Sequence, residues 1–275
     1  MPVHLCKSEL SGNAALPATP EAAEFRLRDR HKLAFGWVPD GCQRVLDGGC
    51  AFGYGTAPLS AKAEIICGCD PSAELIERAR KNCPGIQFQF EICPLEKTPY
   101  ADESFDAITL TDVLEHVADE KAALDEMFRV LKPGGRLIIT TPHKGLFGFM
   151  DPDNYAWHLR TKFPRLYRRL FRMKHGRDPV PKVGYESKHR HYNLDDFVTL
   201  LKNSAFGGHF EIEKVFRGGL FCYVFGSNLF EALSVITGAR FAGRLLRPLG
   251  KLSDWDYFIN YGKLSYYIGI LVKKV

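Results

Sequence analysis

The sequence predicts an α/β fold built on a doubly wound, mostly parallel sheet of seven strands. Short apolar runs alternate with amphipathic helical patterns as far as residue 141, the order expected of successive strand–helix–strand units. A glycine-rich stretch, VLDGGCAFGYG at residues 45–55, follows the first apolar run, as a tight strand-to-helix turn requires. Two more apolar runs near the C-terminus complete the seven strands.

The first elements flank the glycine-rich turn. Apolar residues at helical spacing predict a helix over 21–38, and the short apolar run at 44–47 predicts the first strand. A short helix is predicted over 56–62, with Pro58 tolerated in its first turn. The apolar run at 64–69 predicts the second strand.

A helix and two strands are predicted next. Residues 72–82 carry charges on one face and begin at Ser72, a suitable N-cap, so they predict a helix. Residues 86–91 alternate as a strand does, and the apolar run at 105–111 predicts the fourth strand.

The fifth strand and the helix before it are separated by a strong stop signal. Residues 119–131 form an amphipathic pattern that ends at the Lys-Pro-Gly-Gly sequence of residues 132–135. The run at 136–140 then predicts the fifth strand.

The regular alternation stops after the fifth strand. Residues 142–192 are rich in proline, glycine, histidine and basic residues, and they are too long for a simple loop. We interpret them as a helical insertion that caps the substrate site. Regularity returns with a helix over 194–204 capped by Asn193, followed by strands near 210–216 and 265–272.

The domain organisation follows from these patterns. Residues 1–20 are polar and contain several prolines, which predicts a loose leader. Residues 21–275 are predicted to form a single domain that contains the insertion and a second helical insertion at 226–250.

Composition restricts the class of protein. The 275 residues are 45% hydrophobic, which supports a real core, and the net charge of +5 is a mild excess. The eight cysteines include no C-x-x-C pair, so no metal site is expected and the thiols are predicted to be reduced and buried. We find no signal-peptide pattern and no apolar run long enough to span a bilayer, and therefore expect a cytoplasmic protein.

The glycine-rich turn predicts a nucleoside site. In a doubly wound sheet this turn lies at the carboxyl edge, where ligands bind, and Asp70 ends the second strand about 20 residues on, where an acid can hold a ribose. Asp47 directly precedes the turn and suits a ligand with a positive group, such as S-adenosylmethionine. The glycine spacing fits the dinucleotide fingerprint poorly, which leaves an NAD-dependent oxidoreductase as an alternative.

Four motifs in order across residues 25–143 resemble those of the class I S-adenosylmethionine-dependent methyltransferases. They read VLDGGCAFG, GCDPSAELIERAR, PYADESFDAITLTDVLEHVAD and RVLKPGGRLIITTPH. The resemblance implies the family's seven-stranded Rossmann-like fold and S-adenosyl-L-methionine as cofactor. It is closest to the quinone-biosynthesis group of small-molecule methyltransferases. The chain departs from the family at Ala51, which replaces the middle glycine, and at Cys93-Pro94-Leu95, where many relatives carry an acid.

The resemblance also implies which residues line the cofactor. It assigns four residues to the methionine half, three to the ribose and adenine edge, two to the adenine, and Thr111 to a place under the sulfonium. An arginine before the first strand would reach the cofactor carboxylate, and we select Arg28 over Arg26 and Arg30. The residues of the methionine half are Asp47, Gly49, Cys50 and Gly53. Those of the ribose and adenine edge are Asp70, Pro71 and Ser72, and those that flank the adenine are Pro94 and Leu95.

Catalysis requires positioning and, for a hydroxyl acceptor, a base. We expect methyl transfer to a small-molecule or lipid-linked acceptor at oxygen, with His143, His189 and His191 as candidate bases. The alternative for each histidine is a loop residue bonded to the backbone. A non-catalytic S-adenosylmethionine-binding protein and a methyltransferase acting on RNA are the alternative functions.

The insertion carries the remaining signal. Residues 159–177 combine apolar residues at helical spacing with many arginines and lysines. Such a basic amphipathic helix is typical of a membrane-surface element, which would place the protein at the inner face of a membrane. The alternative is a helix that covers the active site with its basic face in water. A nucleic-acid partner is not expected, because the cofactor half is not notably basic.

Overall fold

The computed structural model describes residues 27, 29–179, 189–246, 252 and 255–275. The predicted leader, the start of the predicted helix 21–38, Arg26 and Arg28 lie outside these residues.

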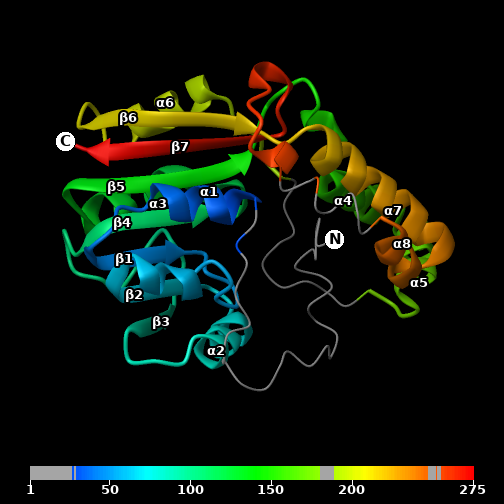
Figure 1. The fold of residues 1–275 in the computed structure, drawn as a ribbon, viewed down its shortest axis with the longest axis horizontal. Helices are drawn as coiled ribbons and strands as arrows, with labels where there is room; N and C mark the ends of the chain where they lie inside the picture. The colour runs from blue at the N-terminus through cyan, green and yellow to red at the C-terminus, as the bar shows by residue number, and fades with distance from the viewer. Residues whose placement is uncertain (1–26, 28, 180–188, 247–251, 253–254) are drawn as a thin grey trace. The chain divides into compact units, whose positions relative to one another are not determined.

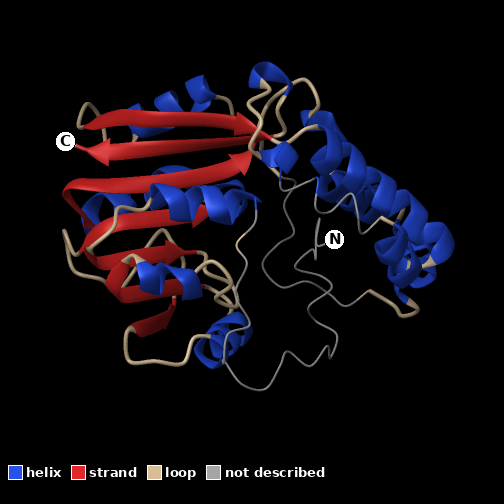
Figure 2. Ribbon diagram, viewed as in Figure 1, coloured by secondary structure: helices blue, strands red, loops and turns tan. Residues whose placement is uncertain are grey.

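Seven strands form one sheet in the order β3-β2-β1-β4-β5-β7-β6 (Figures 1 and 2). The strands are Cys42–Gly48 (β1), Ala63–Asp70 (β2), Phe88–Ile92 (β3), Phe105–Thr111 (β4), Leu131–Pro142 (β5), Phe210–Gly218 (β6) and Tyr267–Lys274 (β7). The pairs β1–β2, β1–β4, β2–β3 and β4–β5 are parallel, and β7 runs opposite to its neighbours (Figure 1). The predicted doubly wound, mostly parallel sheet is confirmed.

The strand order places β1 at a switch point. The chain moves outward from β1 through β2 to β3 and then returns to β4 on the other side of β1. Ligands of doubly wound sheets bind at the carboxyl ends of the strands beside such a point.

Both faces of the sheet are buried, as a doubly wound fold requires. The helices of this part are Asp29–Trp37 (α1), Ala73–Asn82 (α2), Glu120–Val130 (α3) and Leu194–Asn203 (α6), with short turns at Ala57–Ala61 (η1) and Leu114–His116 (η2). Neighbouring residues of one strand enter different cores: Leu46 packs with α3 and α6, whereas Val45 packs with α1. Ile108 and Ala107 alternate in the same way on β4.

The predicted caps are present. The Ser72 hydroxyl accepts the N–H of Leu75 at 3.3 Å and begins α2. Asn193 and Asp196 form a reciprocal capping box at the start of α6. The predicted helix over 56–62 is a single 3₁₀ turn, η1, with proline in its first turn.

The Lys-Pro-Gly-Gly stop is also confirmed and has a further consequence for the sheet. Helix α3 ends at Val130 and β5 begins at once, but its register against β4 shifts: Leu131 pairs with Phe105 and Arg136 with Ala107. Residues 132–135 therefore bulge out of the ladder before pairing becomes regular.

The chain divides into two compact units, which are described separately. One comprises the described parts of 17–142, 192–216 and 268–275, and the other comprises those of 143–191 and 217–267. The second unit contains the described parts of both predicted insertions, except residues 142 and 192. Its helices are Pro152–Lys162 (α4), Pro164–His175 (α5), Gly226–Thr237 (α7) and Ala239–Leu245 (α8), and its short turns are Gly148–Met150 (η3), Phe221–Phe225 (η4) and Gly262–Leu264 (η5).

The helices of the second unit pack in pairs: α4 on α5, α5 on α7, and α7 on α8. Lys174 of α5 reaches both carboxylate oxygens of Glu231 of α7 at 2.9 Å. Among the described residues, no helix is both long and apolar enough to cross a bilayer.

Candidate cofactor site

The turn after β1 has an unusual backbone. Gly49, Ala51 and Gly53 all have positive φ, at +68°, +47° and +87°. Residues of negative φ separate them, so the chain reverses its local hand several times within five residues. Glycine adopts these angles without steric cost, which explains two of the three positions.

The two glycines are also required by close packing of the protein itself. A Cβ added at Gly49 would lie 2.6 Å from both methyl carbons of Val113, and one at Gly53 would lie 2.8 Å from the sulfur of Cys83. The turn is therefore pressed between the segment after β4 and the end of α2.

Ala51 occupies the left-handed region, where a side chain costs about 1–2 kcal/mol. Its N–H donates to the Asp70 carboxylate at 3.2 Å, and the N–H of Cys50 donates to the carbonyl of Cys69 at 3.0 Å. These two bonds attach the turn to the end of β2 and hold Ala51 in its strained conformation.

Asp70 joins three segments at the carboxyl edge. Its side chain is 1% exposed, and besides Ala51 it accepts the N–H of Ser72 at 2.9 Å. Pro71 lies between them and makes the connection short. Asp70 thus links the glycine-rich turn to the start of α2, and the assignment of Asp70, Pro71 and Ser72 to the ribose edge stays a prediction.

Asp47 is a buried carboxylate at the end of β1. It accepts hydroxyl hydrogen bonds from Thr56 at 2.5 Å and Thr109 at 2.9 Å. Burial raises the pKa of Asp47 to about 6, although the two hydrogen bonds act to lower it. The negative charge of Asp70 also acts to raise it. A negative charge at this position is therefore costly without a positive group nearby.

The predicted adenine and methionine contacts differ in exposure. Pro94 is exposed, whereas Leu95 is 5% exposed and packs in the core beside Gly48. Cys50 is buried with Ile76 and Phe90, and burial raises the pKa of its thiol well above the ordinary value. Cys50 is therefore a neutral packing residue that contributes only its backbone to the turn.

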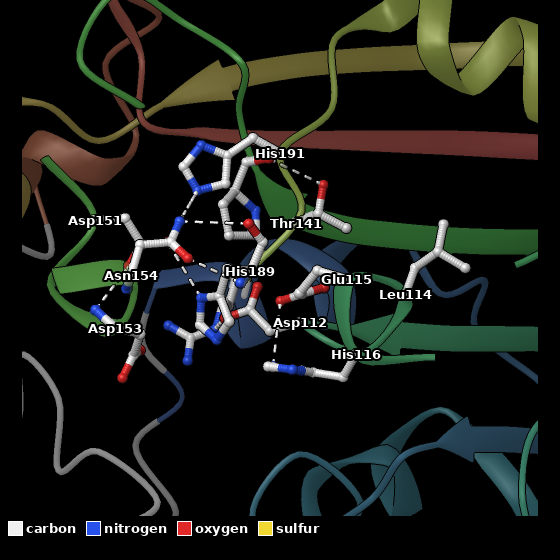
Figure 3. Close-up of polar contacts among 12 residues, drawn as sticks. Asp112, Leu114, Glu115, His116, Thr141, Asp151, Asp153, Asn154, His189 and His191 are labelled. Atoms are coloured by element: carbon white, nitrogen blue, oxygen red, sulfur yellow. Dashed lines mark hydrogen bonds and ion pairs between the residues drawn. The ribbon is translucent and has the colours of Figure 1, made fainter. Parts of the chain in front are cut away.

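The end of β4 carries an ion pair that the sequence interpretation did not anticipate. Thr111 is half-buried, and the next residue, Asp112, has φ +53° and contacts the guanidinium Nε of Arg30 on α1. Arg30 was a competitor of the selected Arg28, which lies outside the described residues. The signal for this pair was the position of an aspartate directly after the predicted strand. Glu115 and His116 follow on η2 (Figure 3). Glu115 is 1% exposed.

The three candidate histidines all belong to the second unit. His143 is 4% exposed, and its Nδ1 lies 3.1 Å from the Ser265 carbonyl and 3.0 Å from the Ser265 hydroxyl. Burial lowers its pKa, so His143 is neutral at physiological pH. His189 and His191 instead meet at one carboxylate, that of Asp151, at 3.2 Å and 2.9 Å (Figure 3).

Sequence comparison finds a family match within the unit that contains the sheet. Residues 46–139 match the family described as "Methyltransferase domain". A ubiquinone/menaquinone biosynthesis C-methyltransferase of Geotalea daltonii is 36% identical over 123 residues, which are 40% of this chain and 51% of the relative. The mitochondrial ubiquinone biosynthesis O-methyltransferase of Rattus norvegicus is 37% identical over 107 residues, 37% of this chain and 31% of the relative. The chain therefore spans about half or less of the length of these relatives.

Solved structures extend the similarity to most of the chain. The [4+2]-cyclase SpnF has a TM-score of 0.56 and 20% identity, over 89% of this chain and 81% of its own. The geranyl diphosphate C-methyltransferase of Streptomyces coelicolor A3(2) has a TM-score of 0.54 and 12% identity, over 89% and 75%. The predicted fold is confirmed as that of the class I methyltransferases. One of these two neighbours is a cyclase, so the fold alone leaves the reaction open.

Proposed function

We propose that this protein, whose residues 46–139 match the methyltransferase-domain family, transfers a methyl group from S-adenosylmethionine to a small-molecule or lipid-linked acceptor. The observation that carries the proposal is the glycine-rich turn held against Asp70 at the carboxyl edge of the sheet. Turn and acid lie within the matched region and beside the switch point of the strand order.

The cofactor roles follow from the chemistry of the donors. Asp70 would accept the ribose hydroxyls, and Pro94 with Leu95 would flank the adenine. Asp47 would face the ammonium and sulfonium charges, which would compensate the charge of its buried carboxylate. Gly49, Cys50 and Gly53 would contribute main-chain surface to the methionine half, and Thr111 would lie under the sulfonium. We propose Arg28 or Arg30 for the cofactor carboxylate.

Methyl transfer is an in-line displacement that releases a neutral thioether, so the protein mainly positions the two reactants. Oxygen is the proposed acceptor atom, for which a base is useful. His143 fits that role chemically. The Ser265 carbonyl can only accept a hydrogen bond, so Nδ1 carries the ring proton and the unprotonated Nε2 is the basic atom. Its lowered pKa keeps the ring in this neutral form.

A lipid-linked acceptor is supported by helix α5. Between Pro164 and His175 the helix carries five basic and no acidic residues, namely Arg165, Arg168, Arg169, Arg172 and Lys174. Three apolar side chains at helical spacing are also exposed: Phe163 at 59%, Leu166 at 46% and Met173 at 53%. Exposed apolar residues between arginines suit the surface of an anionic bilayer. The relatives named for ubiquinone and menaquinone biosynthesis make a quinone precursor the first acceptor to test.

The activity is tested with S-adenosylmethionine labelled in its methyl group, a membrane lipid extract and demethylated quinone precursors. We expect label in an extractable product whose mass spectrum shows one added methyl group on oxygen. Asp70→Asn should lose the activity, whereas Asp106→Asn, at the opposite end of the strands, should keep it. Cofactor binding without any labelled product would favour the non-catalytic alternative, and a methyl group on carbon would overturn the oxygen assignment.

Membrane attachment is tested by co-sedimentation with vesicles that contain phosphatidylglycerol. We expect the protein to bind, and the exposed pair Arg168→Glu/Arg169→Glu to weaken binding by at least about 30-fold, since each basic residue near such a surface contributes about 1 kcal/mol. The matched control, Lys81→Glu/Lys97→Glu, changes the charge equally at exposed positions of the other unit. Equal loss in both variants would mean that α5 has no special part in the attachment.

A further inference from the structure

We propose that Asp151, Asp153 and His189 bind a divalent transition-metal ion. Among the residues that the structure describes, one ligand atom from each lies within 4.8 Å of the other two. All three belong to the second unit, so the site is defined within one compact part of the chain.

One distance within the group equals that between two ligands of a bound cation. Ligand atoms that surround a metal at about 2.1 Å lie about 3 to 3.5 Å from one another. Nδ1 of His189 is already 3.2 Å from Oδ2 of Asp151. Asp153 is two residues further along, in the first turn of α4, and its carboxylate lies within 4.8 Å of both other ligand atoms.

Asp151 is held in place by a second layer of contacts. Asp151 is the N-cap of α4, and its Oδ1 accepts the backbone N–H of Asp153 at 2.9 Å. Its other oxygen, Oδ2, therefore faces the two histidines. His191 Nε2 lies 2.9 Å from Oδ2 (Figure 3). Asn154 donates to the same oxygen at 3.3 Å and also accepts the backbone N–H of His189 at 2.9 Å. Such outer contacts fix the ligands of metal sites.

The donor set selects the kind of ion. Two carboxylates and one imidazole, with no sulfur, suit Mn²⁺, Fe²⁺ or Zn²⁺ rather than Cu⁺. Asp151 is 1% exposed, and a buried carboxylate next to two imidazoles is stabilised by a cation, whether that is a metal ion or a protonated histidine. The H-x-H sequence at 189–191 and the D-x-D sequence at 151–153 carry this signal, which the spacing of the cysteines does not contain.

The test is equilibrium dialysis of the metal-depleted full chain against Mn²⁺ and, separately, Zn²⁺, with bound metal measured by mass spectrometry. We expect one ion per chain, and at least tenfold weaker binding in His189→Ala and in Asp153→Asn. His158→Ala on α4 and Asp178→Asn after α5 change the same residue types outside the group and should bind as the wild type does. Circular dichroism checks that each variant is folded.

Two results would overturn the proposal. One is the absence of binding by the wild-type chain at millimolar Mn²⁺ and Zn²⁺, which would make the group a hydrogen-bonded cluster. The other is equal affinity in the site variants and the controls. Electron paramagnetic resonance of Mn²⁺ gives an independent readout, because His189→Ala should remove one nitrogen coupling from the bound ion.

Discussion

Replacing Asp47 with asparagine should stabilise the apo protein at neutral pH, by an amount that shrinks as the pH falls. The carboxylate is buried and its pKa is raised to about 6 from 3.8. Between these two values the folded protein holds a proton that the unfolded chain has released. The folded state therefore loses stability as the pH rises through this window.

The size of the effect follows from the pKa difference. About two pH units at 1.36 kcal/mol each correspond to about 3 kcal/mol between pH 4 and pH 7. The asparagine side chain carries no charge and makes no such contribution. Asparagine makes weaker hydrogen bonds to Thr56 and Thr109, which changes the free energy of unfolding by an amount that does not depend on pH. The decisive quantity is therefore the slope of the variant minus wild-type difference against pH.

The assay is urea unfolding of the wild type and the variants from pH 3 to pH 7.5 without cofactor. The variant minus wild-type difference in the free energy of unfolding should rise with pH. Asp106→Asn is a control of opposite sign: burial acts to raise its pKa, but hydrogen bonds from Lys132 and from the Arg44 N–H outweigh burial and lower it. That difference should fall with rising pH through the acidic range below about 4. A flat difference for Asp47→Asn would refute the account of a buried, destabilised charge.

Three more outcomes are expected. Ala51→Gly should raise the free energy of unfolding by up to about 1 kcal/mol, measured by urea unfolding, because glycine adopts φ +47° without strain. Gly53→Ala should lower it by about 1–3 kcal/mol in the same assay, since the new methyl group meets the Cys83 sulfur and φ is +87°; unchanged stability would show that the turn rearranges freely. The affinity for S-adenosylhomocysteine, measured calorimetrically, should rise about tenfold from pH 5 to pH 7 as Asp47 ionises, and in Asp47→Asn it should be weak at every pH.

The fold could be predicted because the sequence repeats one pattern. Alternating burial along each strand and the caps at Ser72 and Asn193 are local features, and they placed most element boundaries within a few residues. The turn after β1 was recognisable for the same reason, because its glycines are needed for local backbone geometry.

The parts that could not be predicted depend on contacts between distant residues. Gly49 is required by Val113, which is 64 residues away in sequence. Leu95 was assigned to the adenine, but where it packs depends on the core around Gly48. The sequence predicts only a base at His189, because nothing local indicates that it meets Asp151, 38 residues earlier.

The central claim is that a sulfonium nucleoside binds at the carboxyl ends of β1 and β2 with its ribose on Asp70. Calorimetric titration with S-adenosylhomocysteine tests it most directly. We predict one site per chain in the wild type and in Asp106→Asn, and at least about a hundredfold weaker binding in folded Asp70→Asn, from the loss of charged hydrogen bonds that contribute about 1.5–3 kcal/mol each. A wild-type chain that does not bind, or an Asp70→Asn variant that binds equally well, would contradict the claim.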